Sequence, residues 1–408
     1  MNASPSTMIA ARWHLLTAAP HRMFFATGLA WLLAWSAWWV ALLAARLAGV
    51  HGLEPAAPAL LLHGGVMLYL VLPPFMYGFL LTVFPRWMPA PQPRRGNMLA
   101  AFVLLNGGNL LAITGLWLGI GWLLAGWVAA TLALATITAT LARILWQARE
   151  RASHAFATVA GLVAGLLGMS LFAVALGRGD WMQWPLLRGL GLWGFLLVIY
   201  FGVCHRMVPF FSSRVVPGYE SWRPDWALYL FVALALARAV LELAPTFAWL
   251  ASLPLAALAI ACVLRWRPRR KSGVPLLEVL HLSLAWLAVG LALAAVADLA
   301  AALGAAGLVG RAPLHALGMG FFGGMLVAMV TRVTLGHSGR PLVLDAIDWR
   351  LFLVVQAATV LRVLAEFLPA AGAALGLAAG VAWLVAFGAW AARLLPVYLR
   401  PRADGAPG

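Results

Sequence analysis

Apolar segments of about twenty residues recur along the whole chain, separated by short stretches that hold proline, glycine or charge. A helix of that length is about 30 Å long, which matches the hydrocarbon core of a bilayer. Because lipid offers no hydrogen bonds to the backbone, such segments cross it as helices. The sequence therefore predicts an all-α, polytopic membrane helix bundle with about 12 transmembrane helices. These segments begin near residues 23, 59, 98, 123, 155, 184, 225, 246, 275, 313, 350 and 373.

The composition agrees with a membrane protein. Of the 408 residues, 64% are hydrophobic and 10% are charged, whereas soluble domains carry about 25% charged residues. The formal net charge of +16 would suit a nucleic-acid-binding protein, but the basic residues lie in short loops and not along one stripe. We therefore expect the lipid bilayer as partner and no nucleic acid. The two cysteines, Cys204 and Cys262, have no paired spacing, so we expect no structural disulfide.

The basic residues also predict an orientation. With twelve spans both termini share one side, and the alternate loops assign all but six of the 28 Lys and Arg residues to that side. The positive-inside rule then makes both termini cytoplasmic, with the densest basic loop at residues 265–271. We expect a single membrane domain over 1–408, made of an N-terminal tail (1–22), a transmembrane bundle (23–400) and a C-terminal tail (401–408). The six residues on the other side are Arg46, Arg178, Arg188, Arg238, Arg311 and Arg362.

This topology sorts the histidines into two layers. His63 and His315 begin their spans on the outer side, whereas His205, His281 and His337 lie in the inner layer. His315 and His337 stand 22 positions apart on one predicted helix, which is about 33 Å, so they cannot ligate the same metal. The other four histidines lie in predicted tails or loops, and we expect them to be solvated. They are His14, His21, His51 and His154.

Each outer histidine is followed four residues later by a methionine, in the pairs His63/Met67 and His315/Met319. Positions i and i+4 share one face of an α-helix. Imidazole and thioether together suit a haem iron or copper, because soft sulfur favours Cu(I) and haem accepts His or His/Met axial ligands. The alternative is a methionine that simply packs beside an interfacial histidine.

Arginines accompany the inner histidines, at Arg206, Arg214, Arg332 and Arg340. They can anchor helix ends at anionic headgroups, or they can hold a haem propionate through a bidentate contact.

Other inner-layer features are less specific. Glu278 lies three residues before His281, where it could orient the imidazole ring. Cys204, beside His205, is either a metal ligand or a packing residue.

Two further patterns have structural interpretations. Pro73 and Pro74 interrupt the second span and predict a kink. The segment 318–323 matches GxGxxG, but inside a membrane helix those glycines allow close helix packing or leave room for a flat macrocycle. The chain has no Walker A loop and no Ser/His/Asp set, which disfavours hydrolytic and NTP-driven chemistry.

The run from His315 to Leu342, HALGMGFFGGMLVAMVTRVTLGHSGRPL, closely resembles the signature of the NnrS family. These are polytopic bacterial membrane proteins associated with haem, copper and the nitric-oxide response. Further stretches look similar in the same order: PHRMFF at 20–25, His63 through GFLLTVFP at 78–85, HRMVPFF at 205–211 and VLH at 279–281. One departure is at the second span, where the family pattern is approximately His-x-His-Glu-Met and this chain has Gly65 and Val66 before Met67.

The resemblance implies an inner-membrane protein that binds b-type haem, with or without copper, and that handles nitric oxide or protects against nitrosative stress. If it is an enzyme, the resemblance implies a haem-dependent oxidoreductase acting on nitric oxide. The implied haem-binding residues are His63, His205, His281, His315, His337, Arg206, Arg214, Arg332 and Arg340, and the implied metal ligands are His63, Met67, His315 and Met319.

Two other functions compete with this one. A twelve-helix transporter for a metal or small molecule would show inverted repeats and polar groups near the bilayer centre. The ionisable residues of this chain instead lie near the predicted helix ends, which weighs against transport. A cofactor-free assembly partner of a respiratory complex would need no metal ligands.

Overall fold

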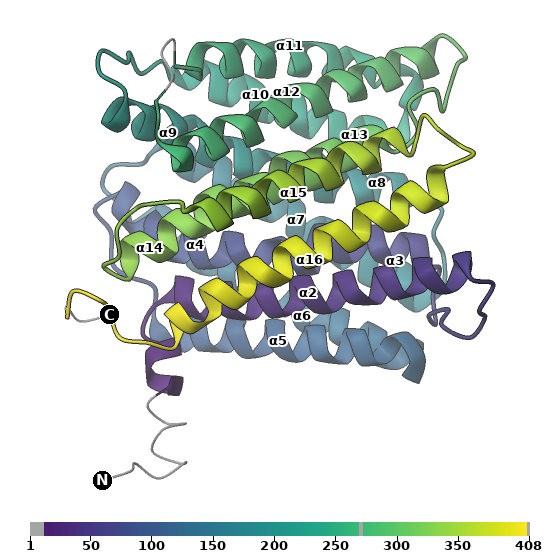
Figure 1. The fold of residues 1–408 in the computed structure, drawn as a ribbon, viewed down its shortest axis with the longest axis horizontal. Coiled ribbons are helices and arrows are strands. Elements are labelled where there is room, and N and C mark those ends of the chain that lie inside the picture. Colours follow the sequence, from purple (N-terminus) through teal and green to yellow (C-terminus); the bar gives the residue numbers. More distant parts are fainter. Residues whose placement is uncertain (1–11, 269–271, 406–408) are drawn as a thin grey trace.

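A computed structural model describes residues 12–268 and 272–405 as one bundle of helices, with no strand in that part of the chain (Figure 1). The predicted all-α membrane bundle is confirmed. The α-helices are α2 (Pro20–Leu47), α3 (Ala59–Val66), α4 (Pro73–Trp87), α5 (Arg95–Leu118), α6 (Ile120–Gln147), α7 (Ser153–Arg178), α8 (Trp184–Gly189), α9 (Val198–Val215), α10 (Asp225–Val240), α11 (Trp249–Trp266), α12 (Pro275–Ala302), α13 (Ala312–His315), α14 (Thr331–His337), α15 (Ala346–Leu364) and α16 (Gly372–Tyr398). Two short 3₁₀ turns, η3 (Leu241–Leu243) and η4 (Pro245–Phe247), join α10 to α11.

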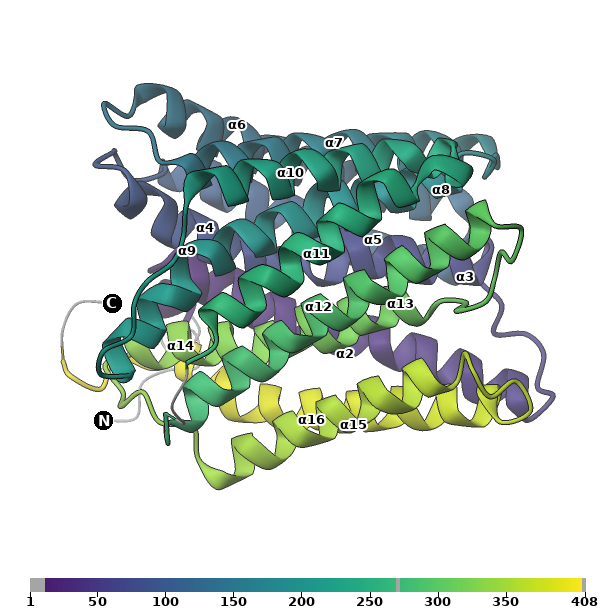
Figure 2. The ribbon, with the colours of Figure 1, turned by 90° about the horizontal axis from the view of Figure 1, so that it is seen from above.

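Eleven helices of the described residues are long and apolar enough to cross a membrane. The remaining predicted span, the one that begins near residue 350, forms α15, which carries Asp348, Arg350 and Arg362 and is not among the eleven. Nevertheless α15 lies lengthwise against α16 (Figure 2). With α15 counted the number of crossings is even, so α2 begins and α16 ends at the same end of the bundle, as Figure 1 shows.

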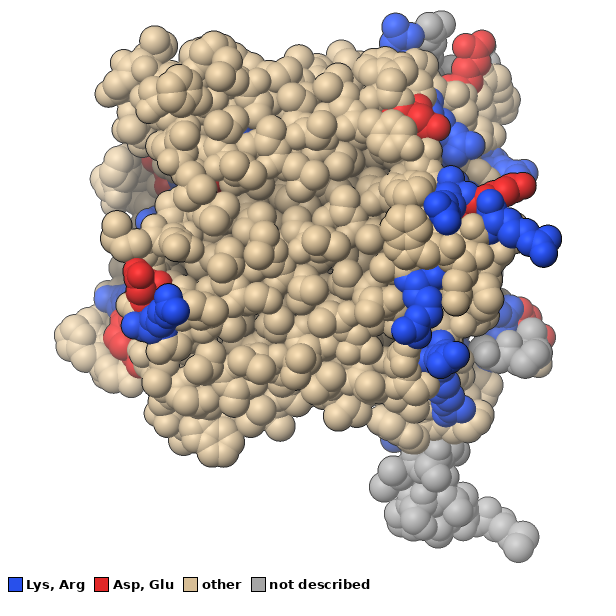
Figure 3. All heavy atoms as spheres, turned by 180° about the vertical axis from the view of Figure 1, so that it is seen from behind, with Lys and Arg blue, Asp and Glu red and all other residues tan. Residues whose placement is uncertain are grey.

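We call this end of the bundle the termini end and the opposite one the far end. Figure 3 shows Lys and Arg gathered at the edge that corresponds to the termini end, with few charges at the far end and none across the broad apolar belt between them. This distribution agrees with the predicted charge imbalance. Residues 269–271 of the basic loop lie outside the described part of the chain. The assignment of the termini end to the cytoplasm stays a prediction.

Three spans form the centre of the bundle, and each is interrupted by π-helix. In an apolar 18-residue window of each span, the share of buried residues is 83% for Ala59–Trp87, 83% for Trp184–Val215 and 72% for Ala312–His337, against 17% for α16. A π-turn bonds residue i to i+5, widens the helix and is frequent at functional sites. The π segments are η1 (Met67–Val71), η2 (Leu190–Leu197), η5 (Ala316–Gly323) and η6 (Leu326–Val330).

Glycines let these central spans approach their neighbours closely. The backbone of Gly168 on α7 lies against the hydroxyl of Tyr69 in η1, where any side chain would collide with it. That hydroxyl donates a hydrogen bond of 2.6 Å to the carbonyl oxygen of Leu187. The predicted break in the second span is confirmed, because η1 ends at Val71 and α4 starts at Pro73.

Two of the three glycines of the GxGxxG match serve packing as well, whereas no atom lies within 4 Å of a Cβ position on Gly318. The indole of Trp286 on α12 lies over Gly320, and the indole of Trp383 on α16 lies over Gly323. The space that a macrocycle would need beside these two glycines is filled by tryptophan rings, so close helix packing is the role the structure supports.

A buried ion-pair network ties three spans together at the far end, Trp184–Val215, Asp225–Leu243 and Pro275–Ala302. Arg238 on α10 forms a bidentate pair with Asp298 on α12, with N–O distances of 2.7 and 2.9 Å. Arg238 also lies 3.1 Å from Glu242, which pairs with Arg188 of α8. The indole of Trp193 donates to Glu242 at 2.9 Å, so both carboxylates are fully engaged. Charges near the helix ends thus fasten helices to one another.

Candidate functional site

The far end brings together the two outer histidines. His63 lies on α3 and His315 ends α13, and both helices reach the far end in Figure 1. The imidazole of His63 stacks on the indole of Trp39 from α2, with ring centroids 4.0 Å apart and an interplanar angle of 11°. His315 lies near His63, and Arg311 and Arg362 are cationic neighbours of it. The predicted outer layer is therefore one local site formed by three spans and α15.

The ring nitrogens of this far-end pair remain available. The Nδ1–H of His315 donates a 3.0 Å hydrogen bond to the carbonyl oxygen of Arg311, which fixes the tautomer and leaves the lone pair of Nε2 free. The Nδ1 atom of His63 is buried and has no hydrogen-bond partner among the described residues. A carbonyl partner on one nitrogen and a free second nitrogen is the usual arrangement of a metal-ligating histidine.

The two methionines differ in their relation to the histidines. The backbone N–H of Met67 bonds to the carbonyl of His63, so the i, i+4 spacing holds there. Met319 lies inside η5, where the bonding pattern is i to i+5. The α-helical argument that placed Met319 on the face of His315 therefore does not carry over to this π segment. Both methionines are half-buried.

The structure accounts for the departure from the family pattern at residues 65 and 66. A Cβ atom on Gly65 would lie 2.6 Å from Cζ of Phe172, so the phenyl ring fills the position that a side chain would need. Val66 is completely buried, where a glutamate would place a charge in an apolar environment. This chain thus replaces a histidine and an acid with aromatic and aliphatic packing, and only His63 and Met67 of that pattern can act as ligands.

At the termini end, His205 is paired with a histidine that the sequence did not mark. Its Nε2–H donates to the carbonyl of Pro224 at 3.2 Å, and its Nδ1 accepts from Nε2–H of His154 at 2.9 Å. The prediction that His154 is solvated is wrong, because it is 5% exposed and opens helix α7 inside the bundle. Both ring nitrogens of His205 are engaged by the protein, so it has no lone pair free for a metal.

The prediction that Glu278 orients the imidazole ring of His281 is also wrong. Oε1 of Glu278 accepts a 2.8 Å hydrogen bond from the hydroxyl of Ser272, and no hydrogen bond joins it to His281 in the described residues. Nε2 of His281 instead lies 3.0 Å from the hydroxyl of Ser212 on α9. A carboxylate three residues away can bond to the preceding loop as easily as to a ring on its own helix.

His337 likewise has a histidine neighbour that was expected to be solvated. The ring centroids of His21 and His337 lie 4.6 Å apart, and His21 is 5% exposed because α2 begins at Pro20 and carries it into the bundle. The three inner histidines therefore have three separate sets of partners. No group of three or more His, Cys, Asp or Glu side chains that could hold a metal occurs in the described residues.

The four inner arginines separate into two kinds. Three lie over aromatic rings: Arg206 over Trp87, Arg214 over Phe210 and Arg332 over Phe211, with the guanidinium carbon 4.1 to 5.5 Å from the ring centroid. Arg340, in the turn after α14, lies near Arg22. Arg332 and Arg340 each keep one buried guanidinium nitrogen without a partner among the described residues. These two alone of the four have an unused buried donor.

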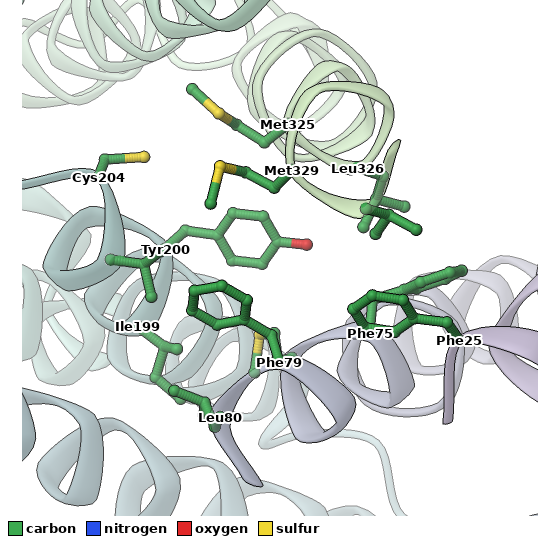
Figure 4. Close-up of a pocket in the computed structure, with 13 residues that line it drawn as sticks. Phe25, Phe75, Phe79, Leu80, Ile199, Tyr200, Cys204, Met325, Leu326 and Met329 are labelled. Atoms are coloured by element: carbon green, nitrogen blue, oxygen red, sulfur yellow. The ribbon is translucent and has the colours of Figure 1, made fainter. Parts of the chain in front are cut away.

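A small cavity lined mostly by apolar side chains lies between α4, α9 and η6 (Figure 4). Tyr200 points its hydroxyl into this space, and that hydroxyl has no hydrogen-bond partner in the described residues although the side chain is 91% buried. The sulfur atoms of Cys204, Met325 and Met329 lie on one side of its ring. Thiol and thioether are soft donors of the kind that favours Cu(I). Cys204 and Cys262 are both free and buried.

A family model described as NnrS protein matches residues 15–402, almost the whole length. No curated protein and no solved structure matches the chain.

Proposed function

The chain belongs to the NnrS family, and from this premise we propose that it is a bacterial inner-membrane protein that binds haem, alone or with copper, and handles nitric oxide. The observation that carries the proposal is the far-end histidine pair, in which His63 and His315 come from different spans and both retain unpaired ring nitrogens. A multi-pass membrane protein of this family is what the helices and the match establish. The haem or copper cofactor, the nitric-oxide ligand and the assignment to the bacterial inner membrane are our inference.

The buried nitrogen of His63 is the strongest indication of a ligand. Leaving a buried polar atom without a partner costs about 1–3 kcal/mol, and coordination to a metal would remove that penalty. Stacking on Trp39 holds the His63 ring in one orientation. The Arg311 carbonyl does the same for His315. Two imidazoles that are fixed before the metal arrives suffer little loss of conformational freedom on binding it.

Cations beside this pair fit the remainder of a haem. Arg311 and Arg362 are charged neighbours of both histidines, and a guanidinium pairs well with a propionate carboxylate. Glu366 holds Arg362 in an ion pair of 2.6 Å and accepts from the backbone N–H of Arg311 at 3.0 Å. The termini-end candidates Arg332 and Arg340 lie at the opposite end of the bundle, so we assign any propionate contact at this site to Arg311 and Arg362.

If one of the two imidazoles held the iron of a haem, the metal would supply a coordination position for nitric oxide. The chain's own contribution is to exclude water and to keep the imidazoles neutral and oriented. Nitric oxide is small and apolar enough to concentrate in lipid, so a site between membrane helices is well placed to meet it.

The test is to purify the protein in detergent from haem-replete cells and to measure iron and copper per chain, oxidised and reduced spectra, and the spectral change on anaerobic addition of nitric oxide. His63→Ala and His315→Ala should each remove the metal and the nitric-oxide response. His51→Ala is the matched control, since His51 is exposed in the loop after α2 at the same end. His205→Ala should also retain the metal.

Other results would contradict the assignment in different ways. A folded wild-type preparation without metal would refute the proposed function and favour a cofactor-free assembly partner. Metal retained in both far-end variants but lost in His337→Ala would move the centre to the termini end. Copper that is lost only in a Met325→Leu, Met329→Leu double variant would place it in the interior cavity.

A further inference from the structure

Six basic side chains lie near one another at the termini end, and we call them the basic cluster. The imidazoles of His21 and His337 are in contact, with ring centroids 4.6 Å apart. Arginines lie near both histidines, and Arg22 has Arg340 and Arg402 as neighbours. The cluster joins the start of α2, the end of α4, the turn after α14 and the segment after α16. Its members are His21, Arg22, Arg86, His337, Arg340 and Arg402.

Three donors of the basic cluster are buried and unused. They are Nδ1 of His21, one guanidinium nitrogen of Arg22 and one of Arg340, and none has a hydrogen-bond partner among the described residues. His21 and Arg22 are 5% and 2% exposed, so bulk water does not satisfy them. The other terminal nitrogen of Arg22 donates to the carbonyl oxygens of Tyr398 at 3.2 Å and Arg400 at 2.9 Å. Arg22 is thus fixed by the end of α16 while its second terminal nitrogen remains free.

Buried guanidinium groups with unused donors favour an anion. Desolvated cations repel one another and each unsatisfied donor is costly, so a negative group among them would stabilise the arrangement. Two guanidinium groups and an imidazole offer N–H donors that match the oxygens of a tetrahedral or planar oxyanion. The cluster lies at the level of the helix ends, where lipid headgroups and dissolved ions are both within reach.

The C-terminal segment already brings a carboxylate to this place. Asp404 forms a bidentate pair with Arg402, and the backbone N–H of Ala403 donates to the carbonyl of Ser338 at 2.9 Å. The carboxyl carbon of Asp404 lies 2.5 Å from the position that a Cβ atom on Gly339 would occupy. Gly339 has φ +68° and no side chain, so the acid rests directly on the turn that carries Arg340.

We propose that the basic cluster is an oxyanion-binding site that takes a phosphate group, either free phosphate or the headgroup phosphate of an anionic lipid, and that Asp404 competes with it. The site is separate from the far-end histidines and does not depend on whether the chain binds haem. A bound phosphate group neutralises positive charge of the cluster and joins the ends of α2, α14 and α16.

The experiment measures binding of radiolabelled inorganic phosphate to the full-length protein in nanodiscs of neutral phosphatidylcholine, at constant ionic strength with chloride as the replaced anion. We expect saturable binding. Arg340→Gln should raise the Kd about ten-fold or more, because it removes a charge-assisted contact. Asp404→Asn should lower the Kd, because the competing carboxylate is gone, and this residue is exposed, so the variant is expected to fold. Arg149→Gln, at an exposed arginine of the α6–α7 loop on the same face, is the matched control and should leave the Kd unchanged.

A second arm identifies the source of the phosphate. If a lipid headgroup is the natural occupant, nanodiscs that contain phosphatidylglycerol will suppress binding of free phosphate in the wild type, and the suppression will be weaker in Arg340→Gln. If free phosphate is the occupant, the two kinds of nanodisc will give the same Kd. The proposal is overturned by an absence of saturable binding in neutral nanodiscs, by equal losses in Arg340→Gln and Arg149→Gln, or by weaker binding in Asp404→Asn.

Discussion

Replacement of Asp298 by asparagine tests whether the buried ion-pair network at the far end stabilises the bundle. The substitution preserves the shape of the side chain and removes its charge. Asp298 accepts two hydrogen bonds from Arg238, at 2.7 and 2.9 Å, and both side chains are almost fully buried, at 11% and 7% exposed. After the change, Arg188 and Arg238 share the single carboxylate of Glu242.

The expected loss follows from this geometry. Removal of one partner from a buried ion pair costs about 3–5 kcal/mol. Glu242 remains 3.1 Å from Arg238 and continues to neutralise part of its charge, so we expect the lower end of that range, about 3 kcal/mol. A double variant, Arg238→Met with Asp298→Leu, removes both charges of the pair, and it should recover most of the lost stability.

The assay is the free energy of unfolding in mixed micelles, titrated with SDS and followed by tryptophan fluorescence. Glu54→Gln provides a matched control, because Glu54 and Arg46 form a bidentate pair of similar length, 2.7 and 2.8 Å, that is exposed at the same end. That control should lose under about 1 kcal/mol. The reasoning would be refuted if Asp298→Asn and Glu54→Gln lost equal stability. It would also be refuted if the double variant lost as much stability as Arg238→Met and Asp298→Leu lose in sum when made singly.

Two further predictions concern packing and capping. Gly65→Ala should lower the free energy of unfolding by about 1–3 kcal/mol, because the new methyl group meets the ring of Phe172; Phe172→Leu in the same chain should restore part of the loss, and a neutral single variant would show that the ring is free to move. Asp345→Ala should cost about 1 kcal/mol, since the Asp345 carboxylate accepts from the backbone N–H groups of Ile347 and Asp348 at the start of α15. The backbone N–H of Asp348, helped by Arg393, holds the pKa of Asp345 below its usual range; its contribution is therefore complete above about pH 4 and is lost as the pH falls through the lowered pKa. Stability of wild type and Asp345→Ala measured between neutral pH and pH 3 should converge at the acid end, and a constant difference would contradict the assignment.

Much of the bundle was predictable because a bilayer imposes a length on every crossing segment. The spans, the shared end of the two termini and the two histidine layers all followed from hydropathy and from the positions of Lys and Arg. For α15, length and hydropathy alone do not identify the span, because it carries charged residues. One of them, Asp348, forms an ion pair of 2.7 Å with Arg393 of α16. A charge inside an apolar window weakens the signal even when a neighbouring helix supplies its partner.

The side-chain partners were not predictable in the same way. His21 and His154 each lie one residue after the start of a helix, and that position looks solvated in a sequence. Their burial depends on which other spans end beside them, which is a property of the tertiary arrangement. The π segments were also not predicted, and they affect which side chains share a helix face. A change from i+4 to i+5 bonding rotates every later side chain relative to an α-helix, and no residue pattern in this chain predicts that change.

The stacked pair of Trp39 and His63 gives the protein an internal optical reporter. An indole in face-to-face contact with an imidazole, 4.0 Å away, will lose fluorescence when that imidazole acquires a redox-active or paramagnetic ion. The difference in emission between the wild type and a Trp39→Phe variant isolates this one fluorophore from the other tryptophans. Occupancy of the far-end site can then be followed during titration with a metal, without a label and without removing the protein from its lipid.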